Sequence, residues 1–137
     1  MRLLVTGSRT LTRTDIRLLR LGLATVCDMA GTRPALVLHG GAHGCDRFAG
    51  EWATAENIPV QVYLPDYHTH GSKAAPLLRN LAMVENCDWV LAVYAPGRNR
   101  KGGTWHTVRA AINAGRHVVE VLSDGRLEYT PPPLTLF

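Results

Sequence analysis

The sequence has few cysteines, no long apolar run and no dense run of charge, and each absence excludes a class of protein. Cys27, Cys45 and Cys87 are widely spaced and form no Cys-x-x-Cys pair, so neither a disulfide framework nor a cysteine zinc site is indicated. No apolar run approaches the roughly 20 residues of a membrane-spanning helix. The apolar start turns to Gly-Ser-Arg at residues 7–9 too early for a secretory signal. These features predict a cytoplasmic protein, with no motif for a metal or other cofactor.

The overall composition is typical of one soluble globular domain. A chain of 137 residues can bury a hydrophobic core, and its hydrophobic share of 46% and charged share of 19% are ordinary values. The formal net charge of +4 suits an anionic small ligand, a nucleic acid or simply a soluble surface. The basic residues are scattered, without the interleaved aromatic residues of a single-strand-binding platform.

Short apolar runs alternate with helical periodicity along residues 1–122. The predicted strands are 1–6, 35–39, 60–64, 89–93 and 117–122, and the predicted helices are 14–29, 45–57, 75–86 and 104–114. We expect Thr14 and Thr104 to cap their helices and Gly115 to follow the last one. The alternation predicts an α/β fold, a Rossmann-like doubly wound sheet, mainly parallel and five-stranded, flanked by helices.

The last residues differ from this pattern. Residues 123–137 are predicted to form a C-terminal tail that packs on the same domain. Asp124-Gly125 indicates a turn, and residues 126–129 are a candidate for a short extra strand.

In an open α/β sheet, ligands bind beyond the carboxyl ends of the strands, so the loops after the strands are the places to search. The second strand leads into a run with three glycines, Gly40, Gly41 and Gly44. This run predicts a tight turn whose amides bind an anion at a helix N-terminus. Asp46 either caps that helix or binds a ribose hydroxyl. Cys45 is either a small core residue or a reactive thiolate.

The other loops add polar and cationic residues. After the third strand, residues 66–73 predict a polar lid in which His68 and His70 are either metal ligands or plain loop residues. After the fourth strand, residues 95–104 form a second glycine-rich turn with three cations. Together the loops predict one anion site near the switch point between the first and fourth strands. The predicted ligand-binding residues are Gly7, Ser8, Arg9, Gly40, Gly41, Ala42, Gly44, Asp46, Arg79, Asn80, Gly102, Gly103 and Thr104.

Four segments also follow a known pattern in order and spacing. They are Gly7-Ser8-Arg9; residues 39–47 with Glu51-Trp52-Ala53; Arg79-Asn80 with Met83; and Gly102-Gly103-Thr104 with Ala110, Ala111 and Gly115. This pattern resembles the YspA-type, YpsA-related branch of the SLOG superfamily, relatives of the DNA-processing protein DprA and the Lonely Guy (LOG) nucleotide phosphoribohydrolases. The resemblance reaches to about residue 121. It implies a Rossmann-like fold that binds nucleotides or nucleotide-derived ligands, a phage or bacterial source, and a homodimer.

The resemblance to the LOG enzymes is incomplete at the catalytic residues. In those enzymes an Arg on the helix before the fourth strand and a Glu after a PGGxGT turn carry out the catalysis. Arg79 matches the former, but Thr107 stands at the position of the Glu, with His106 beside it. Hydrolysis of an N-glycosidic bond needs a group that activates water or stabilises an oxocarbenium ion. His106 or Asp46 could substitute for the missing Glu, and the catalytic candidates are Arg79 and Asp46.

Three functions follow from the sequence, in order of preference. The first is a binding or sensor domain for a nucleotide-like small molecule. The second is a phosphoribohydrolase-like enzyme that cleaves an N-glycosidic bond, with Arg79 holding the phosphate. The third is DprA-like binding of single-stranded DNA, which predicts strong salt dependence.

Overall fold

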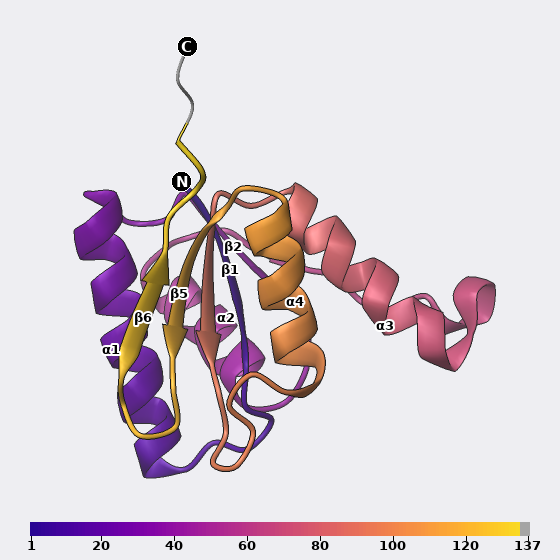
Figure 1. Ribbon diagram of the computed structural model, residues 1–137, viewed down its shortest axis with the longest axis horizontal. Helices are drawn as coiled ribbons and strands as arrows, with labels where there is room; N and C mark the ends of the chain where they lie inside the picture. Colours follow the sequence, from indigo (N-terminus) through magenta and orange to yellow (C-terminus); the bar gives the residue numbers. More distant parts are fainter. Residues whose placement is uncertain (135–137) are drawn as a thin grey trace.

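The computed structural model describes residues 1–134, in which one twisted sheet lies between two layers of helices (Figure 1). The elements are β1 (Arg2–Gly7), α1 (Arg13–Ala30), β2 (Leu36–His39), α2 (Cys45–Ala55), β3 (Val60–Val62), α3 (Tyr67–Glu85), β4 (Trp89–Val93), α4 (Gly102–Asn113), β5 (His117–Val121) and β6 (Leu127–Thr130). The strand order is β3-β2-β1-β4-β5-β6, with β1 to β5 parallel. This is the order of a Rossmann-like sheet, and the predicted α/β fold is confirmed.

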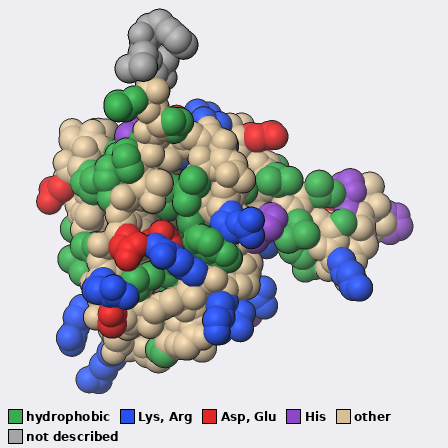
Figure 2. All heavy atoms as spheres, viewed as in Figure 1, with side chains coloured by type: hydrophobic (Ala, Val, Ile, Leu, Met, Phe, Trp, Pro, Cys, Tyr) green, Lys and Arg blue, Asp and Glu red, His purple; other side chains and the backbone are tan. Residues whose placement is uncertain are grey.

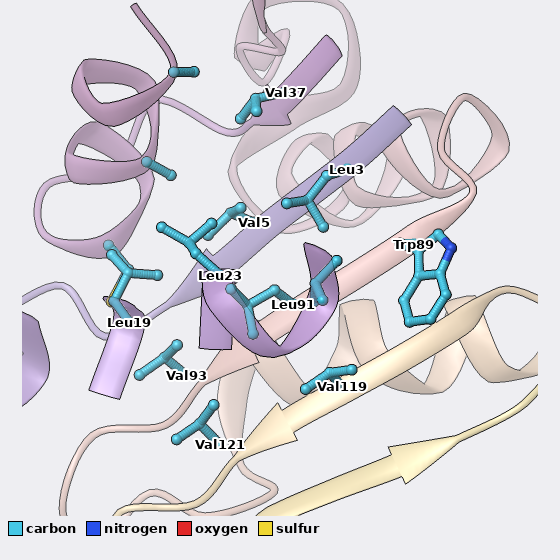
Figure 3. Packing of buried hydrophobic residues seen from close by; sticks show 14 of the residues in the cluster. Leu3, Val5, Leu19, Leu23, Val37, Trp89, Leu91, Val93, Val119 and Val121 are labelled. Carbon is cyan, nitrogen blue, oxygen red and sulfur yellow. The ribbon is translucent and has the colours of Figure 1, made fainter. Parts of the chain in front are cut away.

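Apolar runs form the strands because both faces of the sheet are covered. Leu3 and Val5 pack on the side of α1 and α2, whereas Leu4 packs on the side of α3 and α4. All five residues of β4 are buried, as expected of a central parallel strand. Figure 3 shows the cluster on the α1 side, where Leu19 and Leu23 of the helix meet these strands. Each such side chain contributes about 1.5–3 kcal/mol through burial.

The sheet has six strands rather than five. Leu127–Thr130 pairs antiparallel with β5, so the candidate extra strand is present. The turn before it closes through hydrogen bonds from the Gly125 amide to the Leu122 carbonyl and from the Leu122 amide to the Arg126 carbonyl, both 2.9 Å. Part of the predicted tail therefore extends the sheet, and residues 135–137 lie outside the described part of the chain.

Two of the predicted helix caps are wrong. Thr12, not Thr14, caps α1, where it forms a reciprocal capping box with Asp15. Helix α4 begins at Gly102, so Thr104 lies within its first turn and Lys101 is the N-cap. At the other end of α4, Gly115 has φ of 73° directly after the C-cap, as predicted.

The predicted polar lid is also wrong, because residues 67–73 belong to α3. The Asp66 carboxylate accepts a hydrogen bond from the Thr69 amide at 3.1 Å and so starts a helix that polar residues alone did not suggest. Gly71, with φ of 81°, then breaks the helix into a short hook and a long arm. Figure 1 shows this arm leaving the body of the molecule. Within residues 1–134 no cluster of three or more metal-ligating side chains occurs.

None of the helices within residues 1–134 combines the length and the apolar character needed to cross a bilayer.

Candidate functional site

A cleft of about 490 Å³ opens at the carboxyl edge of the sheet, where β1 and β4 lie side by side. Strand order reverses at this pair, as it does at the ligand sites of doubly wound sheets. Lys and Arg side chains gather at the corresponding lower end of the body in Figure 2. The predicted residues that line the cleft are Gly7, Ser8, Arg9, Ala42, Asp46, Arg79, Asn80, Gly103 and Thr104. The predicted Gly40, Gly41, Gly44 and Gly102 are not among its lining residues.

Sequence reasoning missed several lining residues. They are Thr6, Thr10, Pro76, Leu77, Tyr94, Ala95, Arg98 and Lys101. Arg98 and Lys101 stand in the glycine-rich turn that the sequence singles out, and Tyr94 is the first residue after β4, so their positions carried a signal. No sequence signal marks Pro76 and Leu77 as site residues. They line the cleft because of the direction in which α3 runs in the folded chain.

The amides of the glycine-rich loop 40–42 are already hydrogen-bonded within the protein. The Gly40 and Ala42 amides donate to Oδ2 of Asp46 at 3.0 and 3.2 Å, and the Gly41 amide donates to Nδ1 of His39 at 3.0 Å. Asp46 therefore does not cap its own helix; Gly44 is the N-cap of α2. The prediction that these three amides bind an anion is wrong, because side chains of the same chain occupy them.

Gly44 is a position of this loop at which only glycine fits. Its φ is 83°, and a Cβ added there would lie 2.3 Å from the Ser8 carbonyl oxygen. The Cys45 amide donates to that same carbonyl at 2.9 Å. The loops after β1 and β2 thus touch through backbone, and the contact tolerates no side chain at Gly44.

Asp46 is the single carboxylate that lines the cleft among residues 1–134. Its side chain is buried, and burial raises its pKa to about 6, although the Ala42 and Gly40 hydrogen bonds and the charges of Arg79 and Arg9 lower it. Both hydrogen bonds that Asp46 accepts from the Gly40 and Ala42 amides end on Oδ2. Oδ1 accepts none from the described residues, so this oxygen can take a ligand hydroxyl.

Arg79 ties several elements together behind the cleft. Its Nη1 donates to the carbonyls of Gly40 at 2.7 Å and Tyr63 at 3.2 Å, and its Nε donates to Oδ1 of Asn80 at 2.9 Å. The Asn80 amide nitrogen then faces Nδ1 of His106 at 3.3 Å, so this ring nitrogen is the acceptor. Arg79 fixes the position of α3 against the sheet and leaves Nη2 for a ligand.

The N-terminus of α4 is open to the cleft. No side chain caps it, and its first turn holds no acidic residue, whereas Thr12 and Asp15 close the start of α1. Arg98 lies directly over this end, because a Cβ on Gly102 would be 2.6 Å from its Nη2. With Lys101 also lining the cleft, helix dipole and side-chain charge favour an anion at the same point.

Arg100, the third cation of the turn at residues 95–104, has a different role from Arg98 and Lys101. Arg100 pairs with Glu120 at 3.3 Å and with Glu128, and Glu120 also accepts a 2.7 Å hydrogen bond from the Tyr94 hydroxyl. Burial and this carboxylate raise the pKa of Tyr94. Glu120 is buried in that network and does not line the cleft.

Thr107 stands at the position of the catalytic glutamate of the LOG enzymes, so this chain has no carboxylate there. Thr107 is buried, and its hydroxyl donates to the Gly103 carbonyl at 3.1 Å. His106 lies behind Asn80 and does not line the cleft. Asp46 is therefore the one acidic group of the described chain that a bound ligand can reach in the cleft.

The cysteines are structural. Cys45 and Cys87 are buried, which raises the pKa of each thiol to about 12, and the half-buried Cys27 has a raised pKa as well. The reactive-thiolate interpretation of Cys45 is therefore wrong. Cys27 lies on α1 as a helical residue, but Cys87 follows α3 in a loop rather than lying on a helix.

We expect a thiol reagent such as Ellman's reagent to modify no more than Cys27 rapidly in the folded protein at pH 8, because the other two thiols are buried and protonated. All three should react after unfolding in guanidinium. A Cys27→Ser variant should show no fast reaction when folded. A fast reaction in that variant would contradict the assignment of Cys45 and Cys87 to the core.

Comparison with known proteins agrees with this fold. Residues 1–70 match the model of the YspA, cpYpsA-related SLOG family, a range that includes β1, the glycine-rich loop and α2. The chain is also similar to the "Gene 61 protein" of Mycobacterium phage D29, with 36% identity over 89 residues, which covers 61% of this chain and 69% of the phage protein. The chain belongs to the YspA, cpYpsA-related SLOG family.

Proposed function

We propose that this protein binds a nucleotide or nucleotide-derived small molecule in the cleft, with its phosphate at the N-terminus of α4. The observation that carries the proposal is the uncapped start of α4, which faces a cleft that Arg98 and Lys101 also line. An anion there accepts hydrogen bonds from free backbone amides and is attracted by the helix dipole and both cations. Arg9 and Arg79 also line the cleft and add positive charge to it.

The remaining walls suit the rest of a nucleotide. Oδ1 of Asp46 is placed to accept a hydrogen bond from a ribose hydroxyl. Pro76 and Leu77 form an apolar wall against which a base can pack. The volume of about 490 Å³ falls within the range of about 300–1,000 Å³ that is usual for small-molecule sites.

Isothermal titration calorimetry with adenosine 5′-monophosphate and adenosine tests this proposal. We expect the monophosphate to bind at least about tenfold more tightly than the nucleoside, because the phosphate makes charge-assisted contacts. Lys101→Ala should weaken monophosphate binding, whereas Arg126→Ala, at an exposed cation outside the cleft, should not change it. Equal binding of the two compounds, or no binding of the monophosphate, ADP-ribose or a cyclic nucleotide, would refute the proposal.

Cleavage of an N-glycosidic bond is the second candidate, and the pKa of Asp46 favours it. A carboxyl group with a pKa of about 6 inside a ligand cleft can exchange protons near neutral pH. Chromatography of free base after incubation with a nucleoside monophosphate tests this candidate. We expect release to stop in Asp46→Asn, and no release from the wild-type protein at high concentration would exclude it. Binding of single-stranded DNA would appear instead as a steep salt dependence, which a titration at two salt concentrations measures.

A further inference from the structure

A second cavity lies beside α2, apart from the ligand cleft. Its walls come from α2, from the end of β2 and from the start of β3, the strand at the edge of the sheet. Its volume is about 530 Å³, within the range of about 300–1,000 Å³ that is usual for small-molecule sites. The cavity and the cleft share no lining residue, so a nucleotide in the cleft leaves this cavity without an occupant.

His39 is buried in the wall of this cavity and has one ring nitrogen to spare. The residue is 6% exposed, and burial lowers its pKa, so the ring is largely neutral at pH 7. Its Nδ1 accepts a hydrogen bond from the Gly41 amide at 3.0 Å, which places the ring proton on Nε2. This Nε2–H group donates to no partner within residues 1–134.

The unused N–H group of His39 is directed into the cavity. A Cβ on Gly50 would lie 2.8 Å from Nε2, so this nitrogen faces Gly50, which also lines the cavity. Every fully buried side-chain nitrogen or oxygen of the described residues has a hydrogen-bond partner. The unpartnered Nε2 is therefore accessible, and the cavity is the space that it reaches. A buried donor that is fixed in position and has no partner in the chain indicates a ligand.

One cation and one anion flank this donor. Arg47 and Glu51 stand one turn apart on α2, line the cavity and are both exposed. Neither belongs to an ion pair of the described chain. The other lining side chains are small or aliphatic, and they belong to Gly50, Thr54, Ala55 and Val60. The cavity thus combines a neutral donor, one charge of each sign and an apolar wall.

We propose that this cavity binds an α-amino acid with an aliphatic side chain. The ligand carboxylate accepts from Nε2 of His39 and from Arg47, its ammonium group pairs with Glu51, and its side chain packs against Val60. The charges favour a zwitterion, because a simple carboxylic acid would be repelled by Glu51 and a simple amine by Arg47. This site does not depend on what the cleft binds.

Isothermal titration calorimetry with L-leucine and two truncated analogues tests the site. Isocaproate lacks the amino group of leucine, and isoamylamine lacks its carboxyl group. We expect leucine to bind at least about tenfold more tightly than either analogue. Arg47→Gln and Glu51→Gln should each weaken leucine binding about tenfold, whereas the matched controls Arg109→Gln and Glu85→Gln should stay within about twofold of wild type. Both control residues are exposed and line neither the cavity nor the cleft.

Two further measurements separate this site from a general loss of structure. Glu51→Gln should bind isocaproate at least about threefold more tightly than the wild type does, because a repulsive charge is gone. Long-range proton–nitrogen NMR of the His39 ring should show the Nε2–H tautomer, and leucine should shift its Nε2 resonance. Thermal unfolding should show that all variants are folded, since the substituted side chains are exposed.

Four outcomes would each overturn the proposal. They are no leucine binding at roughly millimolar concentration, equal binding of leucine and its analogues, equal effects of site and control substitutions, and a His39 ring that leucine leaves unchanged. Failure of Glu51→Gln to bind isocaproate more tightly would likewise contradict the role of Glu51 as the partner of the ammonium group.

Discussion

A Gly103→Asp variant is expected to bind adenosine 5′-monophosphate about a hundredfold more weakly than the wild-type protein while keeping its fold. A Cβ at Gly103 meets no atom within 4 Å, and the residue lies in the first turn of α4, where an acidic side chain favours the helix. The new carboxylate would stand where we place the ligand phosphate. Repulsion between two anions about 4 Å apart near a protein surface is on the order of 4 kcal/mol, enough for such a loss.

The matched control is Gly103→Asn, which has nearly the same size and shape but no charge. Its affinity should stay within about threefold of wild type, since the space at Gly103 is open. Calorimetric titration of both variants measures the difference, and thermal unfolding checks that both are folded. Similar weakening in the two variants would mean that the size of the side chain, rather than its charge, matters at this position. It would contradict the proposed position of the phosphate at the start of α4.

The frame of the fold was predictable from the sequence because each central strand is a short apolar run. Residues 89–93 were predicted as a strand and form β4, whose residues are all buried. Local sequence signals were also sufficient to predict Gly115 as the residue that ends α4, and it adopts a left-handed conformation directly after the C-cap. The hook at 67–70 was not predictable from apolar periodicity, because its residues are polar and exposed and its start depends on a side-chain cap from Asp66.

The position of the cleft was predictable, but the hydrogen bonds of each residue were not. The rule that ligands bind at the carboxyl ends of strands selected loops that line the cleft. Whether a loop amide is free depends on which side chain lies behind it, and His39 and Asp46 reach the amides of Gly40, Gly41 and Ala42 only in the folded chain. The same holds for Arg100, which turns to Glu120 across the sheet edge and away from the cleft.

Asp46→Asn is expected to remove a pH-dependent loss of stability of about 3 kcal/mol. The carboxyl pKa is about 6 in the folded protein, against an ordinary value of 3.8, so the folded state holds the proton more tightly than the unfolded chain does. As the pH rises from below 3.8 to above 6, the unfolded chain loses this proton first, and the free energy of unfolding falls. The contribution is fully present below about pH 3.8 and lost above about pH 6. Asparagine does not titrate, and its Oδ1 can still accept from the Gly40 and Ala42 amides.

Urea unfolding of wild type and Asp46→Asn from pH 4 to pH 7 measures this effect. The wild type should lose stability relative to the variant across that range, and Asp124→Asn should not reproduce the trend, because hydrogen bonds from Arg126 lower the pKa of Asp124. A constant difference between wild type and Asp46→Asn would contradict the raised pKa. The same titration bears on function, because a ligand hydroxyl that donates to Asp46 favours the carboxylate. Affinity for the monophosphate should therefore rise as the pH increases through about 6, and this rise should be smaller in the variant, where only the ligand phosphate still titrates. A buried carboxylate that reduces stability at neutral pH is explained if its charged form is the one that holds the ligand.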